Sequence, residues 1–400
     1  MDAFTDSITP QAERHLEALA EELEIPPSRY EAAERSYKSF GDWLHRPTST
    51  VLTYDPQVYV QGSFQLGTAI KPISEAEDYD VDSVCEFKAL GKSSLSQRQL
   101  KAKLGSEVKA YARAQGMSKP VEEGRRCWKL QYADGAQFHM DIVPALPNGS
   151  SMRLLLEQRR LDTRWANTAI AITDNEHHSY ELITEDWPRS NPKGYAQWFR
   201  TKVVEFKTRS LNEERARAEV EAMPTYKIKT PLQSAIMILK RHRDLMFADR
   251  YEERPISIII TTLAAHAYQG EDTIARALVS ILTDLERHIR WDAQGNAVIA
   301  NPTDPLENFA DKWPLHPERK DAFFEWLTAA RHDFFEAAKQ FDRRKITDAV
   351  ARGAGRAIAE KAGEKAFGVA APTVLTSGLV GSAAQAKEKA VRLEGGGRNA

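Results

Sequence analysis

The sequence has very little cysteine, no long apolar run and no excess of charge of either sign. Its two cysteines, Cys85 and Cys127, are too few for a disulfide framework and indicate a reducing compartment. The most apolar run, Ile256 to Ala265, is far shorter than the roughly 18–20 residues that a membrane span requires. The N-terminal segment carries charges where a signal peptide would be apolar. These absences predict a cytoplasmic protein that does not enter a membrane.

The charge balance also limits the classes of partner. Lys and Arg number 55 and Asp and Glu number 57, so the formal net charge is −2. A chain with this balance gives no strong sign of DNA or RNA binding. The 400 residues are 42% hydrophobic and 28% charged, which excludes a disordered chain and predicts about two or three globular domains.

The first half of the chain predicts two helices followed by a sheet. Thr9-Pro10 is typical of a helix N-terminus, and apolar residues at helical spacing run from Leu16 to Leu23 and from Tyr30 to Leu44. Asp134-Gly135 is typical of a hairpin turn. After Pro47 the apolar residues alternate, which predicts strands at 58–60, 80–84, 127–130, 138–143 and 169–173.

The second half of the chain predicts helices. Helix N-termini are indicated by Asn191-Pro192 and Thr230-Pro231, and apolar stripes at helical spacing cover 232–246, 274–289 and 318–339. After about residue 371 the chain is small and polar and ends in a glycine-rich stretch. The expected fold class is therefore α+β, with a sheet-containing first half, a helical second half and a flexible tail.

Two predicted strands carry acidic residues on one face. Alternation along a strand sends the side chains of Asp80 and Asp82 to the same side, and Asp141 has the corresponding place on the later strand. If the strands are neighbours, three carboxylates converge, and such oxygen ligands suit Mg²⁺. An isolated Asp-x-Asp is nevertheless more often a solvated strand than a metal site.

A glycine-serine turn precedes the acidic strand. Gln61-Gly62-Ser63 follows the strand at 58–60, and such a turn offers backbone N–H groups and a hydroxyl to a triphosphate. Alone, this dipeptide is merely a turn. Together, QGSFQLGTAIKP at 61–72, DYDVDSV at 78–84 and FHMDIVPA at 138–145 resemble the nucleotidyltransferase core of the DNA polymerase β superfamily. Within that superfamily they are most similar to the bacterial cGAS/DncV-like nucleotidyltransferases (CD-NTases of the SMODS type), which make cyclic oligonucleotides.

The resemblance implies a role for each matching residue. A polymerase-β-type sheet core with N-terminal helices would occupy residues 1–225, a helical domain completing the nucleotide cleft 226–370, and a flexible tail 371–400. Asp80, Asp82 and Asp141 would be catalytic and would bind two Mg²⁺ ions, for which Mn²⁺ could substitute. Asp78 is an additional acid on the same strand face, and Val81 favours Asp80 and Asp82 as the ligating pair because acid-apolar-acid is the core of the family motif.

The nucleotide would be held by residues from both halves of the chain. By resemblance, Gln61, Gly62 and Ser63 would bind it from the first half, and Lys240 and Ser257 would contact the donor phosphates from the second. From the residues alone, Lys240 reads more readily as a surface lysine beside Arg241 and Arg243, and Ser257 as a helix N-cap. The segment from Asn301 to Asn308 resembles a loop of oligoadenylate-type synthases or is a proline-stiffened turn.

The function implied is the synthesis of a cyclic di- or trinucleotide second messenger from ATP, and from other nucleoside triphosphates, in CBASS-type anti-phage signalling. Two alternatives stay open: a nucleotidyltransferase that modifies a protein, RNA or small molecule, and a catalytically silent nucleotide-binding scaffold. Some relatives are joined through their C-terminal residue to target amines by a ubiquitin-transfer-like partner, which would act here on Ala400. A zinc site at His177-His178 is disfavoured because adjacent loop residues rarely point at one ion.

Overall fold

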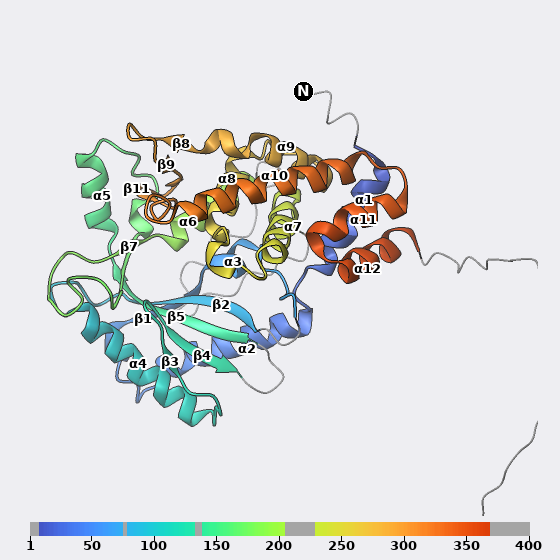
Figure 1. Ribbon diagram of the computed structural model, residues 1–400. Helices are drawn as coiled ribbons and strands as arrows, with labels where there is room; N and C mark the ends of the chain where they lie inside the picture. The colour runs from blue at the N-terminus through green and yellow to red at the C-terminus, as the bar shows by residue number, and fades with distance from the viewer. Residues whose placement is uncertain (1–7, 75–77, 133–137, 205–228, 369–400) are drawn as a thin grey trace, which may run out of the picture. The chain divides into compact units, whose positions relative to one another are not determined.

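The computed structural model describes residues 8–74, 78–132, 138–204 and 229–368. Within these ranges the predicted α+β architecture is confirmed: a mixed sheet occupies the first half of the chain and helices occupy the second (Figure 1). The Asp134-Gly135 turn and the tail expected at 371–400 lie outside the described residues.

Two helices precede the sheet, as predicted. Helix α1 (Pro10–Glu22) begins after Thr9, whose hydroxyl accepts a hydrogen bond from the Ala12 N–H at 3.1 Å. Helix α2 (Pro27–Leu44) begins at a proline, whose missing N–H costs nothing in a first helical turn. Helix α1 therefore starts where the Thr-Pro signal of the sequence places it.

The sheet brings the two acidic strands together. Its main path is β1–β2–β5–β4–β3, with β6 paired to β5 and β7 to β6. The pairing of β2 with β5 is parallel, whereas β1 with β2 and β4 with β5 are antiparallel. The strands are β1 (Pro56–Val60), β2 (Tyr79–Phe87), β3 (Glu122–Glu123), β4 (Trp128–Tyr132), β5 (Phe138–Pro147), β6 (Ile170–Ile172) and β7 (Arg189–Ser190).

One face of this sheet is covered by helices α2 and α4 (Gln97–Ala114) (Figure 1). Val81 of β2 and Met140 of β5 are fully buried on that face in a core with side chains of both helices. Gly105 of α4 lies so close to Trp128 that a Cβ atom there would stand 2.2 Å from the indole ring. Asp80 and Asp82 flank Val81 in β2. Because strand side chains alternate, the packing of Val81 against the helices turns both acids to the opposite face of the sheet.

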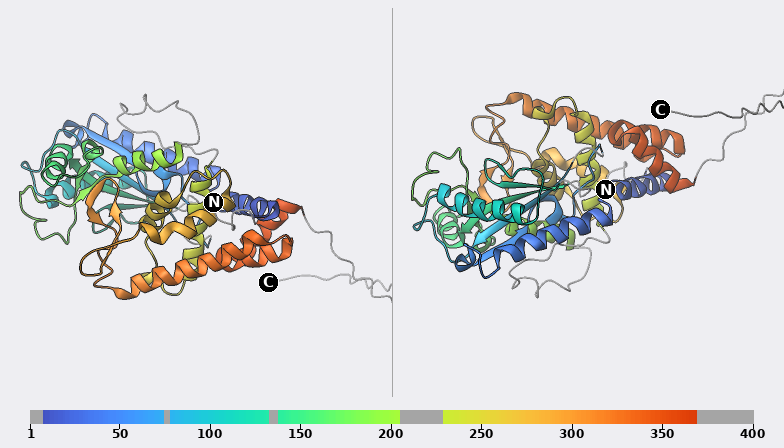
Figure 2. Two further views of the ribbon diagram at one scale, coloured as in Figure 1. Left: turned by 90° about the horizontal axis from the view of Figure 1, so that it is seen from above. Right: turned by 90° about the horizontal axis from the view of Figure 1, so that it is seen from below.

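The second half of the chain has its own helical core. The helices are α6 (Pro192–Val204), α7 (Pro231–Met246), α8 (Ser257–Ala267), α9 (Ile274–Asp284), α10 (Pro317–Lys339), α11 (Arg343–Ala354) and α12 (Arg356–Phe367). Helix α1 joins this core although it is first in the chain, and it lies against α11 and α12 (Figures 1 and 2). Helix α7 starts with a reciprocal cap between Thr230 and Gln233.

Shorter elements connect these parts. They are α3 (Gly62–Leu66), α5 (Gly149–Gln158), β8 (Arg290–Trp291), β9 (Ala297–Val298), β10 (Ala300–Asn301) and β11 (Asp304–Asn308). The predicted helix over 274–289 is shorter than expected: α9 ends at Asp284, a 3₁₀ turn follows, and Ile289 is extended. None of the described helices has the length and apolar character needed to cross a membrane.

Candidate active site

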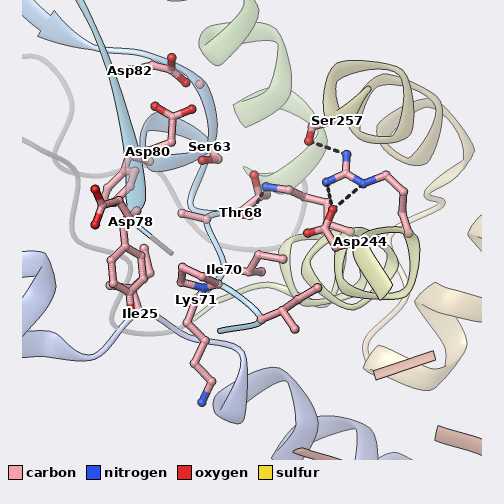
Figure 3. Close-up of a pocket in the computed structure, with 18 of the residues that line it drawn as sticks. Ile25, Ser63, Thr68, Ile70, Lys71, Asp78, Asp80, Asp82, Asp244 and Ser257 are labelled. Atoms are coloured by element: carbon pink, nitrogen blue, oxygen red, sulfur yellow. Dashed lines mark hydrogen bonds and ion pairs between the residues drawn. The ribbon is translucent and has the colours of Figure 1, made fainter. Parts of the chain in front are cut away.

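The three acids predicted from the sequence converge on one edge of the sheet. In the parallel register of β2 and β5, Asp82 stands opposite Asp141 and Asp80 stands opposite His139. All four side chains lie on the sheet face opposite α2 and α4. The direct pairing of β2 with β5 confirms the expectation that the two acidic strands are neighbours. Figure 3 shows Asp80 and Asp82 at the wall of a cavity, near Ser63.

Asp141 has the features of a metal ligand. Its Oδ2 atom lies 3.5 Å from the Lys129 ammonium and accepts a hydrogen bond from the Cys127 thiol at 3.3 Å. Its Oδ1 atom is buried and has no hydrogen-bond partner among the described residues. A buried carboxylate oxygen without a donor is costly unless a ligand satisfies it. Burial and the charge of Asp80 raise the pKa of Asp141 above its usual range.

Asp80 and His139 extend this acidic group. The His139 Nε2 atom lies 3.3 Å from Asp80 Oδ1, and the contact raises the pKa of His139. Asp80, His139 and Asp141 each offer a ligand atom, and these atoms all lie within 4.8 Å of one another. The arrangement can hold a divalent cation, and the carboxylate oxygens suit a hard ion.

Asp82 is the most enclosed of the three acids. Burial, followed by the charges of Asp80 and Asp141, raises the pKa of Asp82 to about 7. Its carboxylate also packs against Gly62, where a Cβ atom would stand 2.5 Å from Asp82 Oδ2. Gly62 has φ +63°, so glycine is required there both for backbone conformation and for space.

The glycine-serine turn is tied to the acidic strand. The Gln61 N–H donates to the Asp82 carbonyl at 2.9 Å, and the Thr68 N–H donates to the Ser63 carbonyl at 2.9 Å. Gly62 and Ser63 open the short helix α3 and line the same cavity as Asp80 and Asp82. The turn and the acids predicted separately from sequence therefore form one site.

Lys240 lines this cavity, so its interpretation as a surface lysine is wrong. The residue is 7% exposed, and its ammonium donates to the Thr68 carbonyl at 2.9 Å. Burial, together with the neighbouring Arg243, lowers the pKa of Lys240 to about 8. A desolvated cation of this kind is a strong partner for an anion that enters the cavity.

Ser257 also lines the cavity but does not cap its helix. The N-cap of α8 is Ile256, and Ser257 is the first helical residue. Its hydroxyl instead accepts a hydrogen bond from Arg243 Nη1 at 2.8 Å, as Figure 3 shows. Arg243 also donates to the Pro255 carbonyl at 3.0 Å and pairs with Asp244. The arginine thus fixes the start of α8 against α7 at the cavity wall.

The cavity joins the acids of the sheet to the cations of the helical half. Its volume is about 750 Å³, and it lies between β2, α3, α7 and the start of α8. Its cationic lining residues are Lys71, Lys129, Lys240, Arg243 and Arg254. Oxygen ligands for a metal on the sheet side and Lys240, Arg243 and Arg254 on the helical side are what a metal-bound triphosphate requires.

Sequence reasoning missed three of these residues. His139 shares a strand face with Asp141, and Lys129 stands opposite Asp141 in the β4–β5 register, so alternation and pairing could have indicated both. Arg243 was grouped with surface residues because nothing local shows that its side of α7 is buried. The His177-His178 pair lies within 4.8 Å of Asp186 but on an exposed loop away from this cavity.

Comparison with known protein families places residues 56–144 in one domain model. The model is described as "Cyclic GMP-AMP synthase DncV-like, nucleotidyltransferase domain", and its span contains the glycine-serine turn and all three acids.

Two curated proteins and one solved structure are similar over most of the chain. A c-di-GMP synthase of Roseivirga ehrenbergii is 28% identical over 339 residues, which cover 84% of this chain and 82% of that protein. The cyclic dinucleotide synthase CdnG of Bradyrhizobium diazoefficiens is 25% identical over 335 residues, covering 78% of this chain and 72% of that protein. The structure of the Bradyrhizobium diazoefficiens CD-NTase CdnG in complex with GTP matches with a TM-score of 0.63 at 18% identity, covering 88% of this chain and 98% of that one.

Proposed function

The chain belongs to the DncV-like nucleotidyltransferases, and from that premise we propose that it joins nucleoside triphosphates into a cyclic dinucleotide. The observation that carries the proposal is the convergence of Asp80 and Asp82, which line a cavity with Ser63 and Lys240, with Asp141 opposite Asp82 in the neighbouring strand. The names of both curated relatives favour a dinucleotide over a trinucleotide product.

A pair of Mg²⁺ ions, or Mn²⁺ in their place, fits the acidic wall. The available donors are carboxylate oxygens, and the buried Asp141 Oδ1 has no other partner among the described residues. Asp80 and Asp82 would hold both ions, and Asp141 would complete the site nearest the acceptor. When bound, such ions activate a hydroxyl and neutralise a leaving pyrophosphate.

The chain's own residues position the reactants. Ser63, Lys240 and Ser257 would hold the phosphates of the donor nucleotide, and Gln61 and Gly62 would shape the turn beneath them. The acceptor hydroxyl oxygen then bonds to the donor α-phosphorus, the bond from that phosphorus to pyrophosphate breaks, and the hydroxyl proton passes to solvent. A second such step closes the ring.

Arg243 has a supporting role in this arrangement. It contacts Ser257 and Asp244 rather than standing free, and it adds positive charge beside Lys240. We therefore assign it to holding the phosphate-facing wall in place.

The decisive experiment is incubation of the purified protein with all four ribonucleoside triphosphates and Mg²⁺ or Mn²⁺. A phosphatase-resistant product of dinucleotide mass, with pyrophosphate release, is the expected result. A trinucleotide mass would correct the ring size. Label transferred to a protein, RNA or small molecule would support a different nucleotidyltransferase activity, and a protein that binds nucleotide without turnover would support the silent scaffold.

In the cell, we propose that the product acts as a second messenger in CBASS-type anti-phage signalling in the cytoplasm. The proposed ubiquitin-transfer-like partner would act on Ala400, which lies outside the described residues. Removal of residues 398–400 should leave synthesis in vitro intact and abolish adducts formed with such a partner. Adducts that persist would exclude attachment through Ala400.

A further inference from the structure

The loop that joins β6 to β7, residues 173–188, carries a cluster of metal-ligating side chains. His177, His178 and Asp186 each offer one ligand atom, and these three atoms all lie within 4.8 Å of one another. His178 Nε2 lies 2.8 Å from Asp186 Oδ2, and the two imidazole rings have their centroids 4.4 Å apart. None of the three residues lines the nucleotide cavity. This loop cluster is therefore separate from the residues of the proposed reaction.

The structure corrects the reason for which the sequence disfavours a metal here. The acids next to the two histidines in sequence are engaged elsewhere: Asp174 pairs with Arg125 and Arg126. Glu176 pairs with Arg125 at 2.8 Å. The third ligand comes instead from Asp186, at the far end of the loop. Adjacent histidines are thus joined by a carboxylate that only the fold brings to them.

The backbone of the loop is anchored on both sides of the cluster. The Ile172 N–H donates to the Pro188 carbonyl at 2.9 Å, which closes the base of the loop. The Ser179 hydroxyl donates to the Asp186 carbonyl at 2.6 Å, which joins the two halves of the loop beside the cluster. Trp187 is buried in the core beneath the sheet. With the backbone held in this way, small side-chain movements are enough to bring the three ligands to one ion.

His177 has a polar group behind its ring, as metal-bound histidines usually have. Its Nδ1 atom lies 2.9 Å from Ser179 Oγ. Because the Ser179 hydroxyl donates to a carbonyl, its oxygen can accept the Nδ1 hydrogen. In that tautomer the Nε2 lone pair of His177 is left for a metal. The Gln97 amide nitrogen lies 3.2 Å from Nδ1 and 3.5 Å from Ser179 Oγ, so it can donate to the hydroxyl oxygen when Nδ1 carries the hydrogen.

We propose that His177, His178 and Asp186 bind one divalent transition-metal ion of the zinc type. Two imidazole nitrogens and one carboxylate oxygen are ligands that Zn²⁺ takes, whereas Mg²⁺ prefers oxygen alone. Ligand atoms around a tetrahedral zinc lie roughly 3.3–3.4 Å apart, so those of the loop cluster need to move by about 1 Å. The ion would replace the hydrogen that now joins His178 to Asp186, and water would complete its coordination.

Such an ion would act as a clip on the loop. The two histidines stand near the start of the loop and Asp186 stands near its end, so one ion cross-links the segment between them. Leu182 and Ile183 in that segment are exposed, so the loop has little apolar packing of its own there. Because an ion that binds only the folded chain stabilises it, zinc should raise the melting temperature.

The test is calorimetric titration of the metal-free full chain with Zn²⁺. Asp80→Asn combined with Asp82→Asn is the background, because among the described residues the loop cluster is then the remaining three-ligand group. One ion per chain should bind with a dissociation constant on the order of 1 µM. At 100-fold excess over that constant, zinc should raise the melting temperature by about 3–5 °C. Co²⁺ in place of Zn²⁺ should show the visible absorption of a four-coordinate ion.

Asp186→Asn is the matched variant, and Glu181→Gln is the control because it changes an exposed carboxylate of the same loop outside the cluster. Asp186→Asn should weaken zinc binding at least about 10-fold and reduce the rise in melting temperature to about half or less. Glu181→Gln should change neither quantity. His178→Ala should behave like Asp186→Asn, and its side chain is 77% exposed, so this variant leaves the packing of the fold intact.

Three results would overturn the site. They are the absence of bound zinc in the Asp80→Asn, Asp82→Asn background, equal zinc affinity in Asp186→Asn and Glu181→Gln, and binding only at millimolar zinc, which would mean an adventitious ion only. Both amide variants are also compared in the otherwise unmodified chain, so the test does not depend on the background. A chain that binds zinc at the loop and makes no cyclic product would contradict the proposed function alone, because the loop cluster shares no residue with the cavity.

Discussion

Gly62→Ala should abolish synthesis while leaving the chain folded. The structure gives two separate costs for this substitution. One is backbone strain at φ +63°, which costs a non-glycine residue about 1–2 kcal/mol. The other is the clash of the new Cβ atom with Asp82 Oδ2 at 2.5 Å, which only movement of Asp82 or of the turn can relieve.

Gly116 offers a control in the same chain. It also has φ +63°, but a Cβ atom there would meet nothing within 4 Å. Gly116→Ala therefore carries the same backbone strain without the clash. Gly116→Ala should lose about 1–2 kcal/mol of unfolding free energy, and Gly62→Ala at least as much, because the clash adds to the shared strain.

The activities of the two variants should differ. A misplacement of about 1 Å at a reacting group costs on the order of 100-fold in rate, so Gly62→Ala should lose at least that factor in pyrophosphate release. Gly116→Ala should retain the rate of the unmodified protein at a temperature where both variants are folded. Equal activity of the two variants would refute the inference that the chemistry depends on the position of the Asp82 carboxylate beside Gly62.

Three further outcomes are expected. Asp80→Asn combined with Asp82→Asn should abolish synthesis without lowering the melting temperature, because like charges that repel are removed; a folded, active double variant would exclude the metal assignment. Lys240→Ala should raise the nucleotide concentration needed for half-maximal rate about 10- to 100-fold, with the exposed Lys345→Ala as control, and an unchanged dependence would remove Lys240 from phosphate binding. Burial lowers the pKa of His15 to about 4, so neutral His15 favours the folded state above pH 6.5 and this contribution is lost as the pH falls toward 4. Between pH 7.5 and 5 the loss should be about 2 kcal/mol in urea unfolding, and a His15→Gln variant with the same pH slope would contradict it.

Much of the fold could be predicted because local signals and tertiary packing agree. Thr9-Pro10 and Thr230-Pro231 predict helix starts from local sequence, and helices start there in the structure, since the threonine hydroxyls accept hydrogen bonds from N–H groups that the helix cannot satisfy internally. Alternation around Asp80 and Asp141 was equally informative, because one face of each strand is packed against helices. The length of α9 was overestimated, since apolar spacing continues past Asp284 into a turn that the same core also buries.

The site was only partly predictable, because several of its residues act across elements distant in sequence. The burial of Lys240 depends on the Thr68 carbonyl, 172 residues away, so no local pattern could distinguish it from a surface lysine. The same holds for Arg243, which reaches the start of α8. Ser257 was placed correctly at the cavity, but its contact is an arginine rather than the helix N–H groups that a cap would satisfy.

The charged residues of the site destabilise the folded protein when no ligand is bound. Burial and the charges of the neighbouring Asp80 and Asp141 raise the pKa of Asp82, and burial beside Arg243 lowers the pKa of Lys240. Each shift means that the charged form is disfavoured where it stands. A bound cation would relieve the repulsion among the acids, and a bound triphosphate would place an anion beside the buried ammonium of Lys240. Because a ligand that binds only the folded state stabilises it, a metal-bound nucleotide held as proposed would relieve this strain and stabilise the fold.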